Sequence, residues 1–195
     1  EFIMGLRVTD EKMINIVEST MTEFNKEIVN ALEKKSCKAK SITIKNNNII
    51  YVEQEDKELG YVGKPKRVDA KLLKEIIKED YIPVIVPMGL DEKGIAYNIN
   101  ADTAAGAVAR SIKSRRLMLL TDIDGVLDNN DKLISEINTV EAKELIDNEV
   151  IHGGMIPKVK TCIDAINNGV RAVVIIDGRK PHSILFELFS DKGAG

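Results

Sequence analysis

The fold is decided by Leu117-Met-Leu-Leu-Thr121 and by the loop that follows it, Asp122-Ile-Asp-Gly-Val-Leu-Asp128. The apolar run is typical of a strand buried in a sheet, and the loop adds three carboxylates where that strand ends. A second apolar run, Ala172–Ile176, predicts a similar strand, and helical patterns at Thr139–Asn148 and Lys158–Asn167 lie between the two. This alternation predicts an α/β fold, with a mainly parallel open sheet sandwiched by helices.

The remaining patterns extend the same fold class toward both ends of the chain. We expect a long helix from Asp10 to about Lys35, a β-hairpin of 41–45 with 49–52 around Asn46-Asn47-Asn48, a strand starting at 60–63, a helix at Asp69–Lys78, a strand buried on both faces at Ile82–Val86, and helices from about Asn100 and at Pro181–Phe189.

Composition and charge exclude several classes of protein. Of the 195 residues, 44% are hydrophobic and 30% are charged, with a net charge of -3, which is ordinary for a globular protein. The basic clusters are short and lack interleaved aromatic residues, so a nucleic-acid partner is not expected. No apolar run reaches the roughly 18 residues of a membrane span. Cys37 and Cys162 have no metal-site spacing, which suits a reducing compartment, and we expect a cytoplasmic location.

Two polar segments precede predicted helices. In Tyr97-Asn-Ile-Asn-Ala-Asp102, Asn100 or Asp102 can cap the following helix, so Asn98 is left over as a candidate ligand-binding residue. In Gly153-Gly-Met-Ile-Pro-Lys158, a lysine lies in the first turn of a helix. Because that end of a helix already carries partial positive charge, Lys158 suggests a bound anion such as phosphate. A plain N-cap and a solvated lysine remain the alternative readings.

Four motifs, taken in order, resemble the acetylglutamate kinase family: Gly5-Leu-Arg-Val-Thr-Asp10, Tyr97-Asn-Ile-Asn-Ala-Asp-Thr-Ala-Ala105, Leu120-Thr-Asp-Ile-Asp-Gly-Val-Leu-Asp128 and Gly153-Gly-Met-Ile-Pro-Lys-Val159. The ending, 177–195, is also similar to that family. The resemblance implies an amino-acid-kinase fold, resembling carbamate kinase, with an acyl-substrate lobe at 1–115 and an ATP-binding lobe at 116–195. The implied reaction is phosphoryl transfer from MgATP to the γ-carboxylate of N-acetyl-L-glutamate, the second step of arginine biosynthesis.

The resemblance also implies residue roles. Arg7 and Asn98 match substrate contacts, Lys158 matches the ligand of the transferring phosphoryl group, and Asp102 matches a carboxylate that organises two lysines. The nucleotide pocket would be walled by Asp122, Ile123, Asp124, Gly125, Val126 and Leu127 and by Val150, Ile151 and His152, with Lys158 also touching ATP. The cofactors would be ATP and Mg²⁺, the metal being carried by the nucleotide.

Two further expectations concern the assembly and the extent of the chain. The apolar stretch Met13–Met21 suits the helix that pairs subunits in the family, so we expect a homodimer, with a hexamer in a longer protein, and His182 with Glu187 resembles the arginine-inhibited branch. The family's opening Lys-Gly-Gly strand and its Gly-Gly-Gly-Pro loop are absent from the printed sequence. We therefore expect an N-terminally truncated chain with little activity alone; an upstream transit peptide would direct it to a plastid.

Two other functions fit parts of the sequence. Asp122 and Asp124 match the nucleophile and acid of haloacid-dehalogenase-type phosphatases, which hold Mg²⁺ between such residues, although only one acid, Asp177, follows the later strand. A regulatory amino-acid-binding domain that has lost catalysis is the second alternative.

Overall fold

The computed structural model describes residues 2–3 and 6–190 and divides the chain into two compact units, residues 1–112 and 113–195. The first unit ends at residue 112, three residues before the end of the first lobe expected from the sequence, residue 115. The chain is an α/β protein, as the sequence predicts. Gly5 and residues 191–195, which belong to the quoted motifs, lie outside the described residues. Across the described residues, no helix combines the length and apolarity that crossing a membrane requires.

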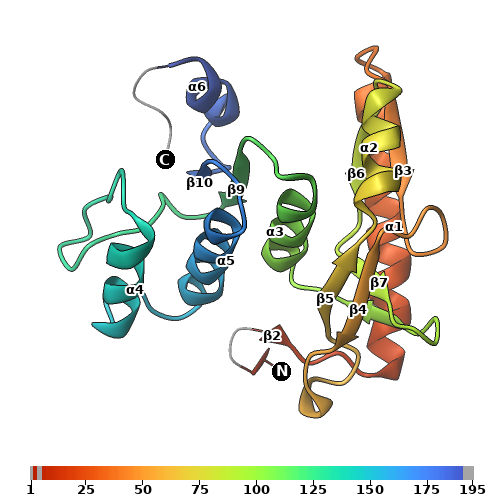
Figure 1. Cartoon of the computed structure of the whole chain (residues 1–195), viewed down its shortest axis with the longest axis horizontal. Coiled ribbons are helices and arrows are strands. Elements are labelled where there is room, and N and C mark those ends of the chain that lie inside the picture. The colour runs from red at the N-terminus through yellow and green to blue at the C-terminus, as the bar shows by residue number, and fades with distance from the viewer. Residues whose placement is uncertain (1, 4–5, 191–195) are drawn as a thin grey trace. The chain divides into compact units, whose positions relative to one another are not determined.

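Among its described residues, unit 1 contains three α-helices, one short 3₁₀ helix and most of the strands (Figure 1). The elements are β1 (Phe2–Ile3), β2 (Leu6–Arg7), α1 (Glu11–Glu33), β3 (Ala39–Ile42), β4 (Ile50–Gln54), the short 3₁₀ helix η1 (Lys57–Leu59), β5 (Gly63–Val68), α2 (Ala70–Lys78), β6 (Ile82–Ile85), β7 (Met88–Leu90), β8 (Ala96–Asn98) and α3 (Ala101–Ile112). Within the described residues, the sheets have the orders β1-β2, β3-β6 and β5-β4-β7-β8. The pairs β3–β6 and β4–β7 are parallel, whereas β1–β2, β4–β5 and β7–β8 are antiparallel.

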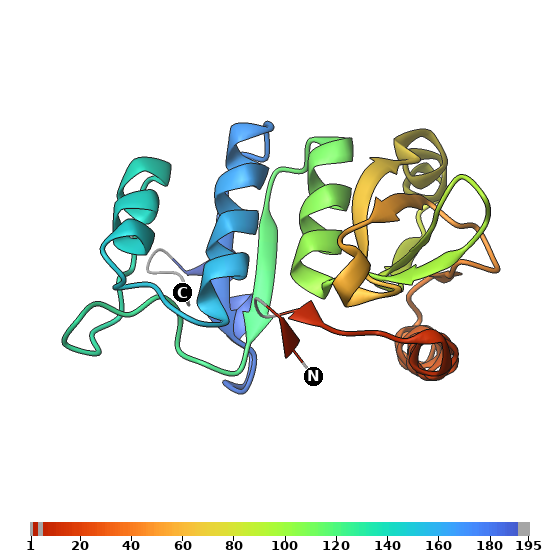
Figure 2. The same ribbon diagram turned by 90° about the horizontal axis from the view of Figure 1, so that it is seen from below.

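Apolar side chains at the ends of β3 and β6, and just beyond these ends, belong to two separate clusters. Ile42 and Ile85 contribute to a cluster under α2 and α3, whereas Ile44 and Val86 contribute to a cluster under α1. Figure 2 shows α1 and α3 on different sides of these strands. Unit 1 is therefore layered, with helices covering the strands from both sides.

The predicted hairpin at 41–52 is wrong. Thr43 and Asn46 do close a turn, each donating its backbone N–H to the other's carbonyl at 2.9 and 3.2 Å. The two arms then separate, because β3 pairs in parallel with β6 and β4 pairs with β5. The expectation that 82–86 is buried on both faces also fails at Ile82, which is 44% exposed. Within the described residues β6 pairs only with β3, so it is an edge strand.

Unit 2 is built on two parallel strands, β9 (Leu117–Thr121) and β10 (Val173–Asp177), in register along their whole length. The helices are α4 (Thr139–Asp147), α5 (Met155–Asn167) and α6 (Ser183–Phe189). α5 begins three residues before the predicted start, which places Lys158 fourth in the helix. The core of the unit gathers Val126, Ala142, Ile151, Val159 and Ile163.

A buried amide fixes α1 to the parallel pair β3–β6. Asn25, only 3% exposed, donates from Nδ2 to the carbonyl of Val84 at 2.7 Å and accepts from the hydroxyl of Ser41. A buried polar group is tolerated only when it is hydrogen-bonded, and here both ends of the amide are used.

Replacing Asn25 by Ala should lower the free energy of unfolding by about 1–3 kcal/mol, because it leaves the Val84 carbonyl and the Ser41 hydroxyl without their partner. Asn15→Ala is the matched control, since the Asn15 amide donates to the Glu11 carbonyl on the exposed face of the same helix. It should change stability by less than about 0.5 kcal/mol. Urea unfolding measures the stability of both variants. An equal loss of unfolding free energy in the two would contradict the role of Asn25 in fixing α1 to β3 and β6.

Candidate functional site

The start of α3 separates the polar side chains of the 97–102 segment. Asn100 is the cap: its Oδ1 accepts the backbone N–H of Thr103 at 3.1 Å, and its carbonyl accepts the N–H of Ala104 at 2.9 Å. Of the two residues that the sequence offered as the cap, Asn100 is therefore the one that caps α3. Asp102 lies half-buried in the first turn of α3, where the helix dipole stabilises a carboxylate. Asn98 and Asp102 are not needed to cap the helix.

Asn98 ends β8 and is half-buried. Its side-chain Nδ2 donates to the hydroxyl of Thr9 at 3.5 Å, and its backbone N–H donates to the carbonyl of Tyr61 at 2.9 Å. The same Thr9 hydroxyl donates to the carbonyl of Arg7 at 3.1 Å. The Arg7 main chain and the Asn98 side chain thus share a contact with Thr9, a residue that the sequence analysis did not single out, while the Arg7 side chain itself is exposed.

Thr9 can reach Asn98 because the chain comes very close at Gly60. The Thr9 backbone exchanges hydrogen bonds with Leu59 and Tyr61, at 3.0 and 2.7 Å. Gly60 between them has φ +68°, and a Cβ there would lie 2.4 Å from the Thr9 carbonyl oxygen. Only glycine accepts both this backbone conformation and this approach.

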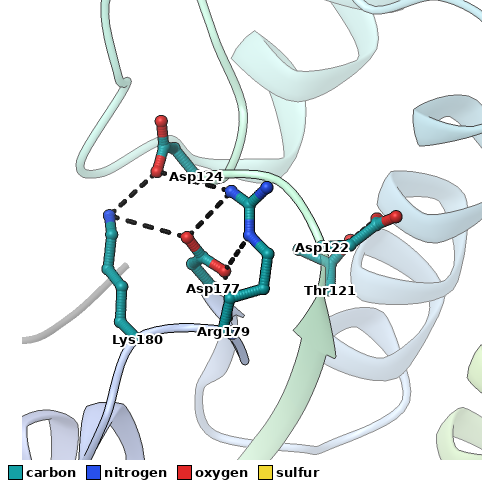
Figure 3. Close-up of polar contacts among 6 residues, drawn as sticks. All are labelled: Thr121, Asp122, Asp124, Asp177, Arg179 and Lys180. Carbon is teal, nitrogen blue, oxygen red and sulfur yellow. Dashed lines mark hydrogen bonds and ion pairs between the residues drawn. The ribbon is translucent and has the colours of Figure 1, made fainter.

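In unit 2, the carboxyl ends of β9 and β10 meet, and the backbone N–H of Gly178 donates to the carbonyl of Thr121 at 2.8 Å. Figure 3 shows the charged side chains that follow these two strands. Asp177 is 2% exposed, and Arg179 forks onto its two oxygens at 2.9 and 3.0 Å. Hydrogen bonds from the side chain and backbone of Arg179 lower the pKa of Asp177 from 3.8 to about 2.

Lys180 connects this pair to the loop after β9. Its Nζ lies 2.9 Å from Oδ1 of Asp124 and 3.9 Å from Oδ2 of Asp177, and the hydrogen bond to Asp124 raises the pKa of Lys180. Asp122 points elsewhere and contacts the Thr121 hydroxyl at 3.5 Å (Figure 3). The sequence reading placed Asp122 and Asp124 together but missed Arg179 and Lys180.

The rest of the predicted nucleotide wall is divided between exposed and buried positions. Asp122, Ile123, Asp124 and His152 are exposed, Gly125, Val126 and Ile151 are buried, and Leu127, Val150 and Lys158 are half-buried. The third carboxylate of the loop, Asp128, accepts the backbone N–H groups of Asn130 and Lys132, so it closes the loop itself.

The start of α5 is open. Its N-cap, Gly154, has no side chain to accept from the first turn, and a Cβ built on Gly153 or Gly154 would meet no atom within 4 Å. The N–H groups of Met155 and Ile156 donate to the carbonyls of His152 and Gly153 at 3.3 Å, and Pro157 has no N–H. Attraction for an anion here would therefore come mainly from the helix dipole and from Lys158, one turn along. Unit 2 also holds a cavity of about 790 Å³ between the 133–139 segment, α5 and β10. Its lining includes Gly125 and Val126 but neither Lys158 nor Asp122, so this cavity is not the predicted phosphate site.

Comparison with known proteins assigns the family. The amino acid kinase family model matches residues 2–177. Acetylglutamate kinase of Pelagibacter ubique is 61% identical over 194 residues, which cover 100% of this chain and 67% of that protein. The chain belongs to the amino acid kinase family. Acetylglutamate kinase of Rhodopseudomonas palustris is 43% identical over 209 residues, covering 100% of this chain and 70% of its own length. Within the family, the chain groups with the acetylglutamate kinases, which are phosphotransferases.

Solved structures share the amino-acid-kinase fold. N-acetylglutamate synthase of Neisseria gonorrhoeae, complexed with coenzyme A and N-acetyl-glutamate, has a TM-score of 0.89 and 24% identity, covering 100% of this chain and 45% of that one. Carbamate kinase of Giardia lamblia bound to AMP-PNP has a TM-score of 0.64 and 15% identity, covering 94% and 72%. The family match sets aside the phosphatase alternative. In addition, Asp177, the acid at the end of β10, already accepts two hydrogen bonds from the Arg179 guanidinium.

The lowered pKa of Asp177 predicts a specific acid sensitivity. A carboxyl group with a folded-state pKa below its unfolded value stabilises the fold above about pH 4, and that stabilisation is lost as the pH falls toward 2. Wild type should therefore exceed Asp177→Asn in stability at pH 7, and the difference should shrink between about pH 4 and 2.

Urea unfolding of both proteins across this range measures the difference. Asp122→Asn, which removes an exposed carboxylate outside the Arg179 fork, is the control. A difference between wild type and Asp177→Asn that stays constant from pH 7 to 3 would contradict the assignment.

Proposed function

We propose that this chain transfers the γ-phosphoryl group of MgATP to the γ-carboxylate of N-acetyl-L-glutamate, giving N-acetylglutamyl 5-phosphate. The observation that carries the proposal is 61% identity to an acetylglutamate kinase along the whole chain. This reaction is the second step of arginine biosynthesis. The residues that catalyse it would bind and orient two anions, ATP and N-acetylglutamate.

Unit 1 would supply the acyl-substrate contacts. The guanidinium of Arg7 can fork onto a carboxylate, and Asn98 can both donate to and accept from a polar group of the substrate. The Thr9 hydroxyl contacts the Arg7 carbonyl and the Asn98 amide, which supports a shared role for the two residues.

Unit 2 would supply the nucleotide contacts. The uncapped start of α5 and the open space at Gly153 and Gly154 suit phosphate oxygens, and Lys158 can neutralise charge on the transferring group. The Asp122–Leu127 loop and the Val150–His152 segment would wall the nucleotide. Mg²⁺, brought by ATP, would neutralise part of the charge on the phosphate groups.

Phosphoryl transfer of this kind needs no covalent enzyme intermediate, so Asp122 would bind and never be phosphorylated. The role of Lys158 is electrostatic: a cation placed where charge develops stabilises the transition state more than the ground state. Asp102 is assigned to the same step as the carboxylate that organises the catalytic lysines, a role that rests on the family resemblance.

Lys158→Ala should reduce turnover by about 10²–10³-fold, because it removes a preorganised charge from the transferring group. The assay is ATP-dependent acyl phosphate formation on N-acetylglutamate, trapped with hydroxylamine, in the protein that the gene encodes. Lys160→Ala, an exposed lysine two residues further along α5, is the matched control and should keep nearly full activity. Equal losses in both variants would overturn the role of Lys158.

The same assay, applied to a polypeptide of these 195 residues alone, tests whether they contain all the residues that catalysis needs. We propose little or no turnover, because the family's second catalytic lysine and its Gly-Gly-Gly-Pro loop are not among these residues. Full turnover by this polypeptide would contradict that proposal, whereas it would leave the proposed reaction intact.

Asn98 and Asp102 should affect different kinetic constants. Asn98→Ala removes a contact that is made to bound substrate, so it should mainly raise the KM for N-acetylglutamate. Asp102→Asn keeps the shape of the side chain but removes its charge, so it should mainly lower kcat. Steady-state kinetics at saturating ATP separate the two effects, and a kcat loss without a KM change in Asn98→Ala would reject its binding role.

We also propose a homodimer formed through α1, where Ile16 and Phe24 are each 57% exposed although their helix packs on β3 and β6. Ile16→Glu with Phe24→Glu should convert the dimer to monomer in sedimentation velocity, whereas Glu27→Lys, at an exposed position of the same helix, should not. A hexamer, and feedback inhibition by arginine through His182 and Glu187, are further proposals that rest on the family resemblance alone.

A further inference from the structure

We infer that Thr9 is a positioning residue for the acyl substrate, and that its buried hydroxyl fixes both the Arg7 main chain and the orientation of the Asn98 amide. The inference rests on the proposed function, which assigns Arg7 and Asn98 to substrate binding. Thr9 itself is 0% exposed and touches no solvent.

The two hydrogen bonds of the Thr9 hydroxyl run in opposite directions. A threonine hydroxyl has one hydrogen and two acceptor lone pairs. The hydrogen is used toward the Arg7 carbonyl at 3.1 Å, so toward Asn98 the oxygen can only accept. The side chain of Asn98 must then present Nδ2 to Thr9, because its Oδ1 would oppose a second acceptor.

The contact with Thr9 limits how the Asn98 amide can meet a substrate. Because one N–H of the Asn98 amide donates to Thr9, the Oδ1 and the second N–H of this amide remain for other partners. The positions of this acceptor and this donor relative to each other are then fixed. An asparagine amide that could turn freely could exchange the places of its oxygen and nitrogen, and it would lose this rotational freedom when substrate binds. Fixing the group beforehand removes that cost from binding.

Thr9 itself lies on a segment that backbone hydrogen bonds hold in place. Its backbone is bonded to Leu59 and Tyr61, and the Tyr61 carbonyl accepts from the backbone N–H of Asn98. Thr9 also directly precedes Asp10, whose carboxylate caps α1 by accepting from Met13 at 2.7 Å. The hydroxyl therefore sits on a segment fixed from both sides, which is what a positioning group requires.

The test compares Thr9→Val, which keeps the shape but removes the hydroxyl, with Thr9→Ser, which keeps the hydroxyl. In the protein that the gene encodes, Thr9→Val should raise the KM for N-acetylglutamate about three- to tenfold, the loss expected for one hydrogen bond. The KM for ATP should stay unchanged, and Thr9→Ser should stay within about twofold of wild type.

Two controls separate positioning from general damage. Thr43→Val removes another buried threonine hydroxyl of unit 1, one that accepts from the Asn46 backbone N–H, and it should leave the KM for N-acetylglutamate unchanged. In a double-mutant cycle, the effects of Thr9→Val and Asn98→Ala should be clearly less than additive, because part of the Thr9 effect passes through the Asn98 side chain. Additive effects, an unchanged KM in Thr9→Val, or an equal rise in Thr43→Val would overturn the inference.

A measurement without substrate keeps the inference distinct from the proposed function. The side-chain amide signal of Asn98 in a ¹H–¹⁵N NMR spectrum should shift in Thr9→Val and return toward its wild-type position in Thr9→Ser. If wild type fails to phosphorylate N-acetylglutamate, the proposed function fails. If that signal is the same in wild type and Thr9→Val, the Thr9 contact fails, whatever the kinetics show.

Discussion

Parallel pairing of strands is the constraint on which the candidate site of unit 2 depends. Parallel strands finish at the same edge of a sheet, so whatever follows them is gathered there. The pairing of β9 with β10 in full register places the Asp122–Leu127 loop beside the Asp177 turn, although some fifty residues separate them in the chain. The fork from Arg179 to Asp177 and the contact of Lys180 with Asp124 then close that edge.

Local signals in the sequence were sufficient for most helices, because a helix is made from neighbouring residues. Asp10 and Asp69 cap α1 and α2 where the apolar periodicity begins, and Asn100 caps α3. Strand partners were not readable in the same way. The alternation at 41–45 fits a strand equally well whether it pairs with the next strand or with β6, and that choice depends on contacts between residues far apart in sequence.

The candidate site was predictable to the extent that function restricts residue type. Lys158 stood out because a cation at a helix start is electrostatically unfavourable, and Asn98 because its amide was not needed as a cap. Thr9 gave no comparable signal, since a buried threonine before a helix is common and only its contacts distinguish it. Arg179 and Lys180 had a readable cue, since they are two cations that follow Asp177, the last residue of a strand, after one glycine. Their role could not be predicted without knowing that the loop after β9 lies beside them.

The close approach at Gly60 makes this position intolerant of substitution in a way that is independent of chemistry. Even alanine meets two obstacles there, a backbone angle that side chains rarely adopt and a carbonyl oxygen 2.4 Å away. In a library of variants, position 60 should therefore behave like a residue that touches ligand, although it lines no site and carries no functional group. The sensitivity of position 60 to substitution would reflect the packing that holds Thr9 in place. A loop glycine can therefore be mistaken for a binding residue when mutational tolerance alone is used to locate a site.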